Sequence, residues 1–159
     1  MIRHAALAAL VVCAGSGFPG LSEVEGSRNL VRLKADPTYT VQPAPQSVWD
    51  GVYTLAQAKR GALKSGLCTS CHGDGFIGGS APELTGDAFL ARWEGRSVAD
   101  LFDLIRLTMP DDDPGALPRE QYADLIAYIL AVNKFPEGRT EIGTAIDPLK
   151  TIRILATKP

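Results

Sequence analysis

The segment Cys68-Thr69-Ser70-Cys71-His72 combines residue types that can hold a metalloporphyrin. Two thiols separated by two residues can form thioether bonds to the two vinyl groups of one porphyrin. The imidazole of His72, directly after the second cysteine, is then held where it can bind the iron from one face. This spacing is typical of covalent attachment of a c-type haem through Cys68 and Cys71.

Two other chemistries also use closely spaced cysteines. A zinc site needs four ligands, and no convincing fourth accompanies the two cysteines and the histidine of the motif. A thioredoxin-type dithiol belongs in a strand–helix unit, and no strand-rich pattern surrounds this motif. Haem attachment is the favoured interpretation, and a redox dithiol or a metal site is the weaker alternative.

The N-terminus has the features of an export signal. Arg3 is followed by an apolar run from Ala5 to Ala14, which is shorter than the roughly 20 residues that span a membrane. We therefore expect residues 1–16 to be a signal peptide and the mature protein to be periplasmic. The alternatives are a buried N-terminal helix and a lipoprotein anchor at Cys13, which the bulky Val12 disfavours.

Removal of this signal would leave few residues able to bind haem iron. The chain has 3 cysteines, 2 histidines and 2 methionines, and the signal contains Met1, His4 and Cys13. His72 and Met109 would then be the histidine and the methionine of the mature chain. Methionine is often a flexible core residue, but no second imidazole remains, so we expect Met109 to be the sixth iron ligand.

Composition and length fit one small exported domain. The formal net charge of −2 over 159 residues gives no basic excess for nucleic acid binding. Residues 17–46 lack periodicity and end in a Pro-rich stretch, which predicts a flexible linker. A compact unit over 47–135 and a C-terminal tail over 136–159 follow. So small a unit is marginal from side-chain burial alone, and a covalent porphyrin would add apolar surface.

Three helices and no strands are expected in the compact unit, so the predicted fold class is all-α. The first covers 50–63, the second begins at the capping pattern of Ser97 and Asp100 and runs to Leu107, and the third begins at Pro118. The first has apolar or long side chains near helical spacing at Val52, Leu55, Ala56, Lys59 and Ala62. The third has a buried stripe at Tyr122, Leu125, Ile126, Ile129 and Leu130. We expect the third to end with Asn133 in the left-handed conformation.

These features together resemble a class I, monohaem c-type cytochrome over 47–135. The resemblance is carried by the haem motif, the segment 81–86, Thr108-Met109-Pro110 and the tyrosine-bearing last helix. More narrowly, Phe89–Trp93, the helix at 100–102, Tyr122–Asp124 and the Asn133–Gly138 tail are similar to cytochromes that accompany PQQ-dependent alcohol or sugar dehydrogenases.

The resemblance implies a small cytochrome c fold with three main helices wrapped around one covalent haem. It implies that the Pro82 carbonyl accepts a hydrogen bond from the His72 ring, and that Gly61 crosses Tyr128 closely. It also implies that Trp93 packs near the haem, for which ordinary core packing is an equal alternative. Lys64 departs from the family, which often has an aromatic residue at that position.

The function expected on these grounds is electron transfer by a periplasmic protein that is not an enzyme. Electrons would come from a dehydrogenase, such as a PQQ-dependent one, and pass to a downstream cytochrome or oxidase. The alternative is a haem enzyme or gas sensor with a displaceable sixth ligand. The acidic loop Asp111–Asp113 has two interpretations of its own: a surface that steers a partner electrostatically, or a solvated turn.

Overall fold

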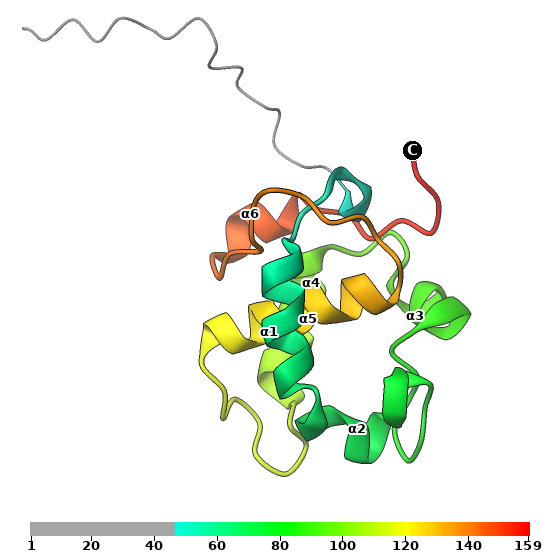
Figure 1. Cartoon of the computed structure of the whole chain (residues 1–159), viewed down its shortest axis with the longest axis vertical. Helices are drawn as coiled ribbons and strands as arrows, with labels where there is room; N and C mark the ends of the chain where they lie inside the picture. Colours follow the sequence, from blue (N-terminus) through cyan, green and yellow to red (C-terminus); the bar gives the residue numbers. More distant parts are fainter. Residues whose placement is uncertain (1–46) are drawn as a thin grey trace, which may run out of the picture. The chain divides into compact units, whose positions relative to one another are not determined.

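Helices joined by loops make up residues 47–159, the part of the chain that the computed structural model describes (Figure 1). The predicted signal peptide and linker, residues 1–46, lie outside it. The described part has two isolated bridges, from Arg153 to Ser47 and to Ser97, and no strand. The all-α prediction is therefore confirmed. The helices are η1 (Val48–Asp50), α1 (Leu55–Lys64), α2 (Gly66–His72), η2 (Asp74–Phe76), α3 (Gly86–Trp93), α4 (Val98–Thr108), α5 (Arg119–Val132) and α6 (Ile146–Lys150).

Helices α1 and α5 cross at Gly61 of α1, a residue without a side chain. A methyl group on Gly61 would overlap the carbonyl group of Asp124 and lie 2.8 Å from the Cβ of Tyr128. Figure 1 shows the two helices crossing at a steep angle in the middle of the molecule. Glycine at position 61 therefore sets how closely these helices approach.

The helix predictions from sequence succeed for α4 and α5. Ser97 caps α4 with its hydroxyl on the Asp100 amide, and the Asp100 carboxylate returns to the Ser97 amide, so the predicted capping box is present. The predicted stripe of α5 is buried along its whole length. The end of α5 differs, because Asn133 has φ −82° and Lys134 takes the left-handed conformation at φ 64°. The side-chain amide of Asn133 instead donates a hydrogen bond to the Leu84 carbonyl and accepts one from the Gly86 backbone amide.

The prediction for the first helix is wrong in its start, and the residues noted at helical spacing do not form its buried face. Helix α1 begins at Leu55, after the extended cap residue Thr54. Its buried residues are Gln57, Ala58 and Gly61. Of the residues noted at helical spacing, Val52 is buried but precedes the helix, and the other four are exposed. The physical reason is the close crossing with α5, which small residues permit. The exposed residues of the expected face are Leu55, Ala56, Lys59 and Ala62.

The segment 136–159 packs onto the domain as part of its core. The Gln57 side chain is 2% exposed and makes two hydrogen bonds to the backbone of Ile142, at 2.9 and 2.8 Å. The Val48 amide donates to the Arg153 carbonyl at 2.9 Å. The apolar residues that this segment adds to the core are Ile142, Leu149, Ile152 and Ile154. The segment expected to be a tail thus closes the core against α1 and α4. Within residues 47–159, no helix has the length and apolar character needed to cross a membrane.

Replacing Gly61→Ala should destabilise the protein by about 2 kcal/mol, because the new methyl group meets backbone atoms that cannot move without separating α1 from α5. Urea denaturation of the purified protein measures this difference. Gly66→Ala is the matched control, since Gly66 is also helical and a methyl group there meets nothing within 4 Å. Equal stabilities of the two variants would contradict the close crossing.

Candidate functional site

A cavity of about 600 Å³ lies among α2, α3, α4 and α5. Its volume is within the range of roughly 300–1,000 Å³ that is usual for small-molecule and cofactor sites. Cys68, Cys71, His72, Pro82 and Met109 all line it. The structure therefore brings these sequence-predicted residues together around one space. Most of the remaining lining is apolar and includes Leu67, Phe76, Leu84, Phe89, Trp93, Leu101, Leu104, Ile105, Leu117, Leu125 and Ile129.

The haem motif forms a short helix of its own, α2, which is not among the three helices predicted from the sequence. Residues i and i+3 of a helix lie on one face, so Cys68 and Cys71 both reach the cavity. Cys68 is half-buried and Cys71 is exposed, and neither forms a disulfide. Burial raises the pKa of the Cys68 thiol. The two thiols are free for attachment to a group that occupies the cavity.

His72 is the last residue of α2, is 7% exposed and is oriented by the loop that follows it. Its Nδ1 lies 2.6 Å from the Pro82 carbonyl oxygen. A carbonyl can only accept a hydrogen bond, so Nδ1 carries the proton and Nε2 keeps a lone pair for a metal. This is the contact that the resemblance implies.

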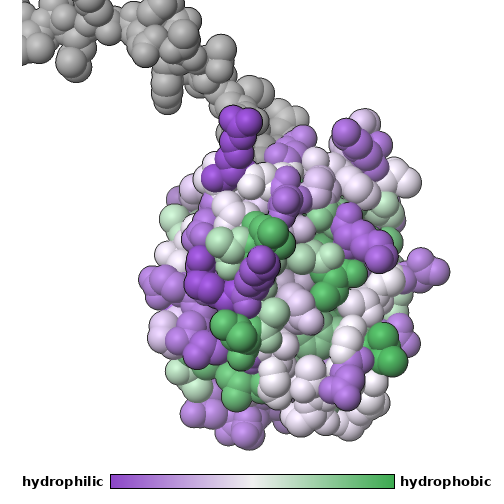
Figure 2. All heavy atoms as spheres, viewed as in Figure 1, coloured by the Kyte–Doolittle hydropathy of each residue, from purple (hydrophilic) through white to green (hydrophobic). Residues whose placement is uncertain are grey.

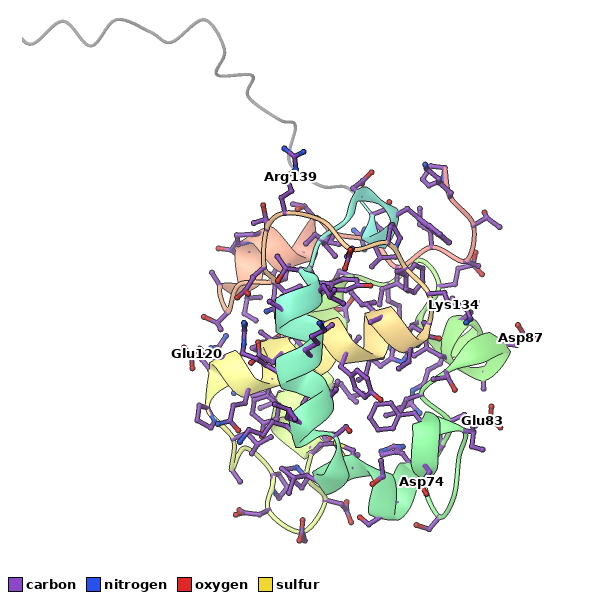
Figure 3. All side chains as sticks on the ribbon, in the orientation of Figure 1. Asp74, Glu83, Asp87, Glu120, Lys134 and Arg139 are labelled. Atoms are coloured by element: carbon purple, nitrogen blue, oxygen red, sulfur yellow. The ribbon has the colours of Figure 1, made fainter. Side chains whose placement is uncertain are left out.

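The loop between His72 and Pro82 reverses direction within a few residues. The Gly78 amide donates to the His72 carbonyl at 2.8 Å, and the Ala81 amide donates to the Cys71 carbonyl at 2.9 Å. Gly73 has φ 76°, a conformation that residues with a side chain rarely adopt, and a methyl group there would overlap the Gly78 carbonyl. Glycines thus let the chain fold back tightly enough to bring Pro82 to the imidazole. Figure 3 labels Asp74 and Glu83 in this part of the chain, and Glu83 also belongs to the cavity lining.

Met109 reaches the cavity from a different element, the C-terminal cap of α4. Its amide donates to the Ile105 carbonyl at 2.8 Å, which completes the last helical turn. Its own carbonyl accepts a hydrogen bond of 2.9 Å from the Tyr122 hydroxyl. Met109 is half-buried, so its backbone is fixed on both sides while its side chain belongs to the cavity lining.

Trp93 is 2% exposed and both packs in the core and lines the cavity. Its ring centroid lies 6.4 Å from that of Phe89, and the Arg96 guanidinium lies 4.5 Å from the Trp93 centroid. The two interpretations offered by the sequence, core packing and contact with a cofactor, are therefore compatible at this residue.

Four charged side chains belong to the cavity lining. Glu83, Asp111 and Asp112 are acidic, and Arg92 is the one Lys or Arg residue among the lining residues. Arg92 is not recognisable as a site residue from the sequence, because an exposed arginine on a short helix has no distinguishing pattern. Among the residues that the structure describes, no three His, Cys, Asp or Glu side chains form a group that could hold a metal ion. The cavity is thus suited to a largely apolar group with a few charges.

Comparison with known families agrees with this geometry. Residues 56–129, just under half of the chain, match the model of the family described as cytochrome C oxidase, cbb3-type, subunit III. No curated protein and no solved structure matched the chain. The match supports a c-type cytochrome with the small all-α cytochrome c fold, and such a domain carries a covalently bound c-type haem. The narrower similarity to cytochromes of PQQ-dependent dehydrogenases stays a prediction.

The residues of the cavity fit this cofactor. Two free thiols, an imidazole with a fixed tautomer and a thioether all reach one apolar space. Arg92 would be the residue of this lining to pair with a haem propionate, because a guanidinium pairs well with a carboxylate. Arg92 is therefore the residue that we assign to the propionates.

Replacing Arg92→Gln should lower the reduction potential by an amount on the order of tens of millivolts. A cation beside the haem disfavours the oxidised iron, which carries one more positive charge, so its removal favours oxidation. Spectroscopic redox titration of the purified holoprotein measures the shift. Arg96→Gln is the control, because Arg96 stacks on Trp93 but is not part of the cavity lining. Equal potentials for both variants would contradict the assignment.

Proposed function

We propose that this protein is a periplasmic electron carrier whose single c-type haem has His72 and Met109 as axial ligands. The observation that carries the proposal is the shared cavity, whose lining includes both side chains together with Cys68 and Cys71. When bound, the haem supplies one-electron chemistry by cycling its iron between Fe(II) and Fe(III). A His/Met ligand pair raises the potential relative to harder ligands, which suits a protein that accepts electrons from a dehydrogenase.

The chain's own residues have three tasks in this proposal. The Pro82 carbonyl orients His72 through its ring N–H. The apolar lining excludes water from most of the cofactor and so helps to set its potential. The thioether bonds at Cys68 and Cys71 keep the cofactor in place during both redox states. None of these tasks involves a bound substrate, and the protein that we propose is therefore a carrier that is not an enzyme.

The alternative is a haem enzyme or gas sensor with an exchangeable sixth ligand. Such a protein needs a sixth position that opens to a small molecule. The half-buried Met109, with backbone hydrogen bonds to Ile105 and Tyr122, favours a closed position. No other histidine lies in the described residues to act as a distal group. These observations support the carrier over the sensor.

Substitution of Met109→Ala separates the two functions. We expect the oxidised wild-type holoprotein to show the weak long-wavelength absorption band of methionine–Fe(III) coordination, and the variant to lack it. The reduced variant should bind carbon monoxide rapidly, whereas the reduced wild type should not. A wild-type protein with a high-spin spectrum that binds carbon monoxide readily would contradict the carrier proposal.

The electron donor that we propose is a dehydrogenase, with a PQQ-dependent alcohol or sugar dehydrogenase as the narrower candidate. A downstream cytochrome or oxidase would accept the electron. Asp111 and Asp112 lie in the cavity lining, and all three acidic residues of the loop Asp111–Asp113 are exposed. The carboxylates of this loop would give the surface around it a negative electrostatic potential. The loop would therefore favour a donor or acceptor with a positively charged face.

Neutralising this loop should change the reactions with small charged reagents in opposite directions. In the triple variant Asp111→Asn, Asp112→Asn, Asp113→Asn, reduction by cationic hexaammineruthenium(II) should slow and oxidation by anionic hexacyanoferrate(III) should accelerate, each about two- to fivefold at low ionic strength. Stopped-flow absorbance follows both reactions. A variant with Glu94→Gln, Glu120→Gln and Glu137→Gln changes the net charge equally at exposed positions that do not line the cavity. If both triple variants behave alike, the loop has no special part in steering.

A further inference from the structure

Tyr122 lies between the core and the loop that carries Met109. It is in the first turn of α5, is 1% exposed and belongs to the cavity lining. Its ring packs against Phe102, with 6.5 Å between the ring centroids and an interplanar angle of 69°. The sequence explains only its burial, as one member of an apolar stripe. A buried tyrosine also needs a partner for its hydroxyl group.

The Tyr122 hydroxyl joins the two ends of the segment 109–117, which connects α4 to α5. It donates to the Met109 carbonyl at 2.9 Å and accepts from the Leu117 amide at 3.3 Å. We infer that Tyr122 is a positioning residue. Its hydroxyl group is hydrogen-bonded to both ends of this segment and in this way holds Met109 at the haem. The inference rests on the proposed ligation by Met109 and adds the group that keeps this ligand in place.

The other hydrogen bonds of the segment do not provide this connection. The Asp113 amide donates to the Pro110 carbonyl at 3.1 Å, and the Ala116 amide donates to the Asp113 carbonyl at 3.2 Å, so both stay within the loop. The Gly115 amide reaches the Met109 carbonyl at a longer 3.4 Å. Residues 111–116 are exposed. Within the described residues, the Tyr122 hydroxyl is thus the side-chain group of the core that anchors both ends of the loop.

Loss of this hydroxyl would weaken the sixth position without touching the ligand itself. The Met109 carbonyl would keep only the long bond from Gly115, and the Leu117 amide would lose its partner. Unpaired polar groups in a buried setting are costly. The loop would therefore rearrange until the Leu117 amide and the Met109 carbonyl form hydrogen bonds with water. The Met109 side chain would then leave the iron more often, and a small external ligand could take its place.

The test is Tyr122→Phe in the full-length holoprotein. We expect a weaker methionine–Fe(III) band and an affinity of the oxidised protein for imidazole that rises about tenfold, because the sixth position opens more often. Absorption spectra and an imidazole titration give both values. In addition, exchange of the Leu117 amide with solvent, followed by nuclear magnetic resonance, should be slow in the wild type and about tenfold faster in the variant.

Tyr53→Phe is the matched control. Tyr53 is 3% exposed, its hydroxyl donates to the Phe135 carbonyl at 2.6 Å, and it does not line the cavity. This control should lose stability but keep the wild-type band and imidazole affinity. If Tyr122→Phe behaves like Tyr53→Phe in both spectroscopic measurements, the positioning role is overturned. Rapid exchange of the Leu117 amide in the wild type would also overturn it, even if the variant does not fold. A wild type without the methionine band would overturn the ligation itself, which is a different result.

Discussion

The close crossing of α1 and α5 at Gly61 is the constraint from which the haem site is built. Helix α1 leads directly into α2, so the depth of α1 against α5 fixes where the haem motif begins. Helix α5 supplies Tyr122, Leu125 and Ile129 to the cavity lining. The crossing therefore sets the distance between the wall that carries the covalent attachment and the wall behind it. Figure 2, in the same orientation as Figure 1, shows polar residues interspersed with apolar ones on this face. The large apolar residues that are exposed in the described part of the chain are Leu55, Leu63, Leu67, Ile77 and Leu107.

Ion pairing reinforces this crossing from outside. The Arg60 guanidinium contacts the Asp124 carboxylate at 2.9 Å and the Glu141 carboxylate at 2.7 Å. One side chain thus ties α1 to α5 and to the C-terminal segment. Arg60 is about half exposed, so solvent screening keeps the contribution of each pair small. The two buried hydrogen bonds between the Gln57 side chain and the Ile142 backbone contribute more to stability, because a buried amide left without its partners is costly.

The sequence predicts some elements well because their signals are long or chemically specific. The capping box at Ser97 and the α5 stripe depend on residues at fixed spacing, and both appear as expected. The two cysteines and the histidine of the haem motif, also at fixed spacing, line one cavity with Met109. The buried face of α1 was not predictable from apolar periodicity, because Gly61 and Gln57 carry no hydrophobic signal. Helices α2, α3 and α6 are too short to show a helical period. The packing of 136–159 depends on backbone hydrogen bonds to residues far away in the chain, which no local pattern reveals.

In the function that we propose, a carrier differs from a sensor in the hydrogen bonds that hold the sixth ligand more than in the identity of that ligand. Methionine is a weak iron ligand with a flexible side chain. In a mobile loop, water would readily replace it at the iron. Here the loop starts at the last hydrogen-bonded turn of α4 and ends beside Tyr122, whose hydroxyl contacts both ends. Two packed helices and one hydroxyl therefore restrict Met109, the sixth ligand in our proposal, to one position. A fixed ligand set also limits the rearrangement that accompanies each change of iron charge, which is the property that a one-electron carrier requires.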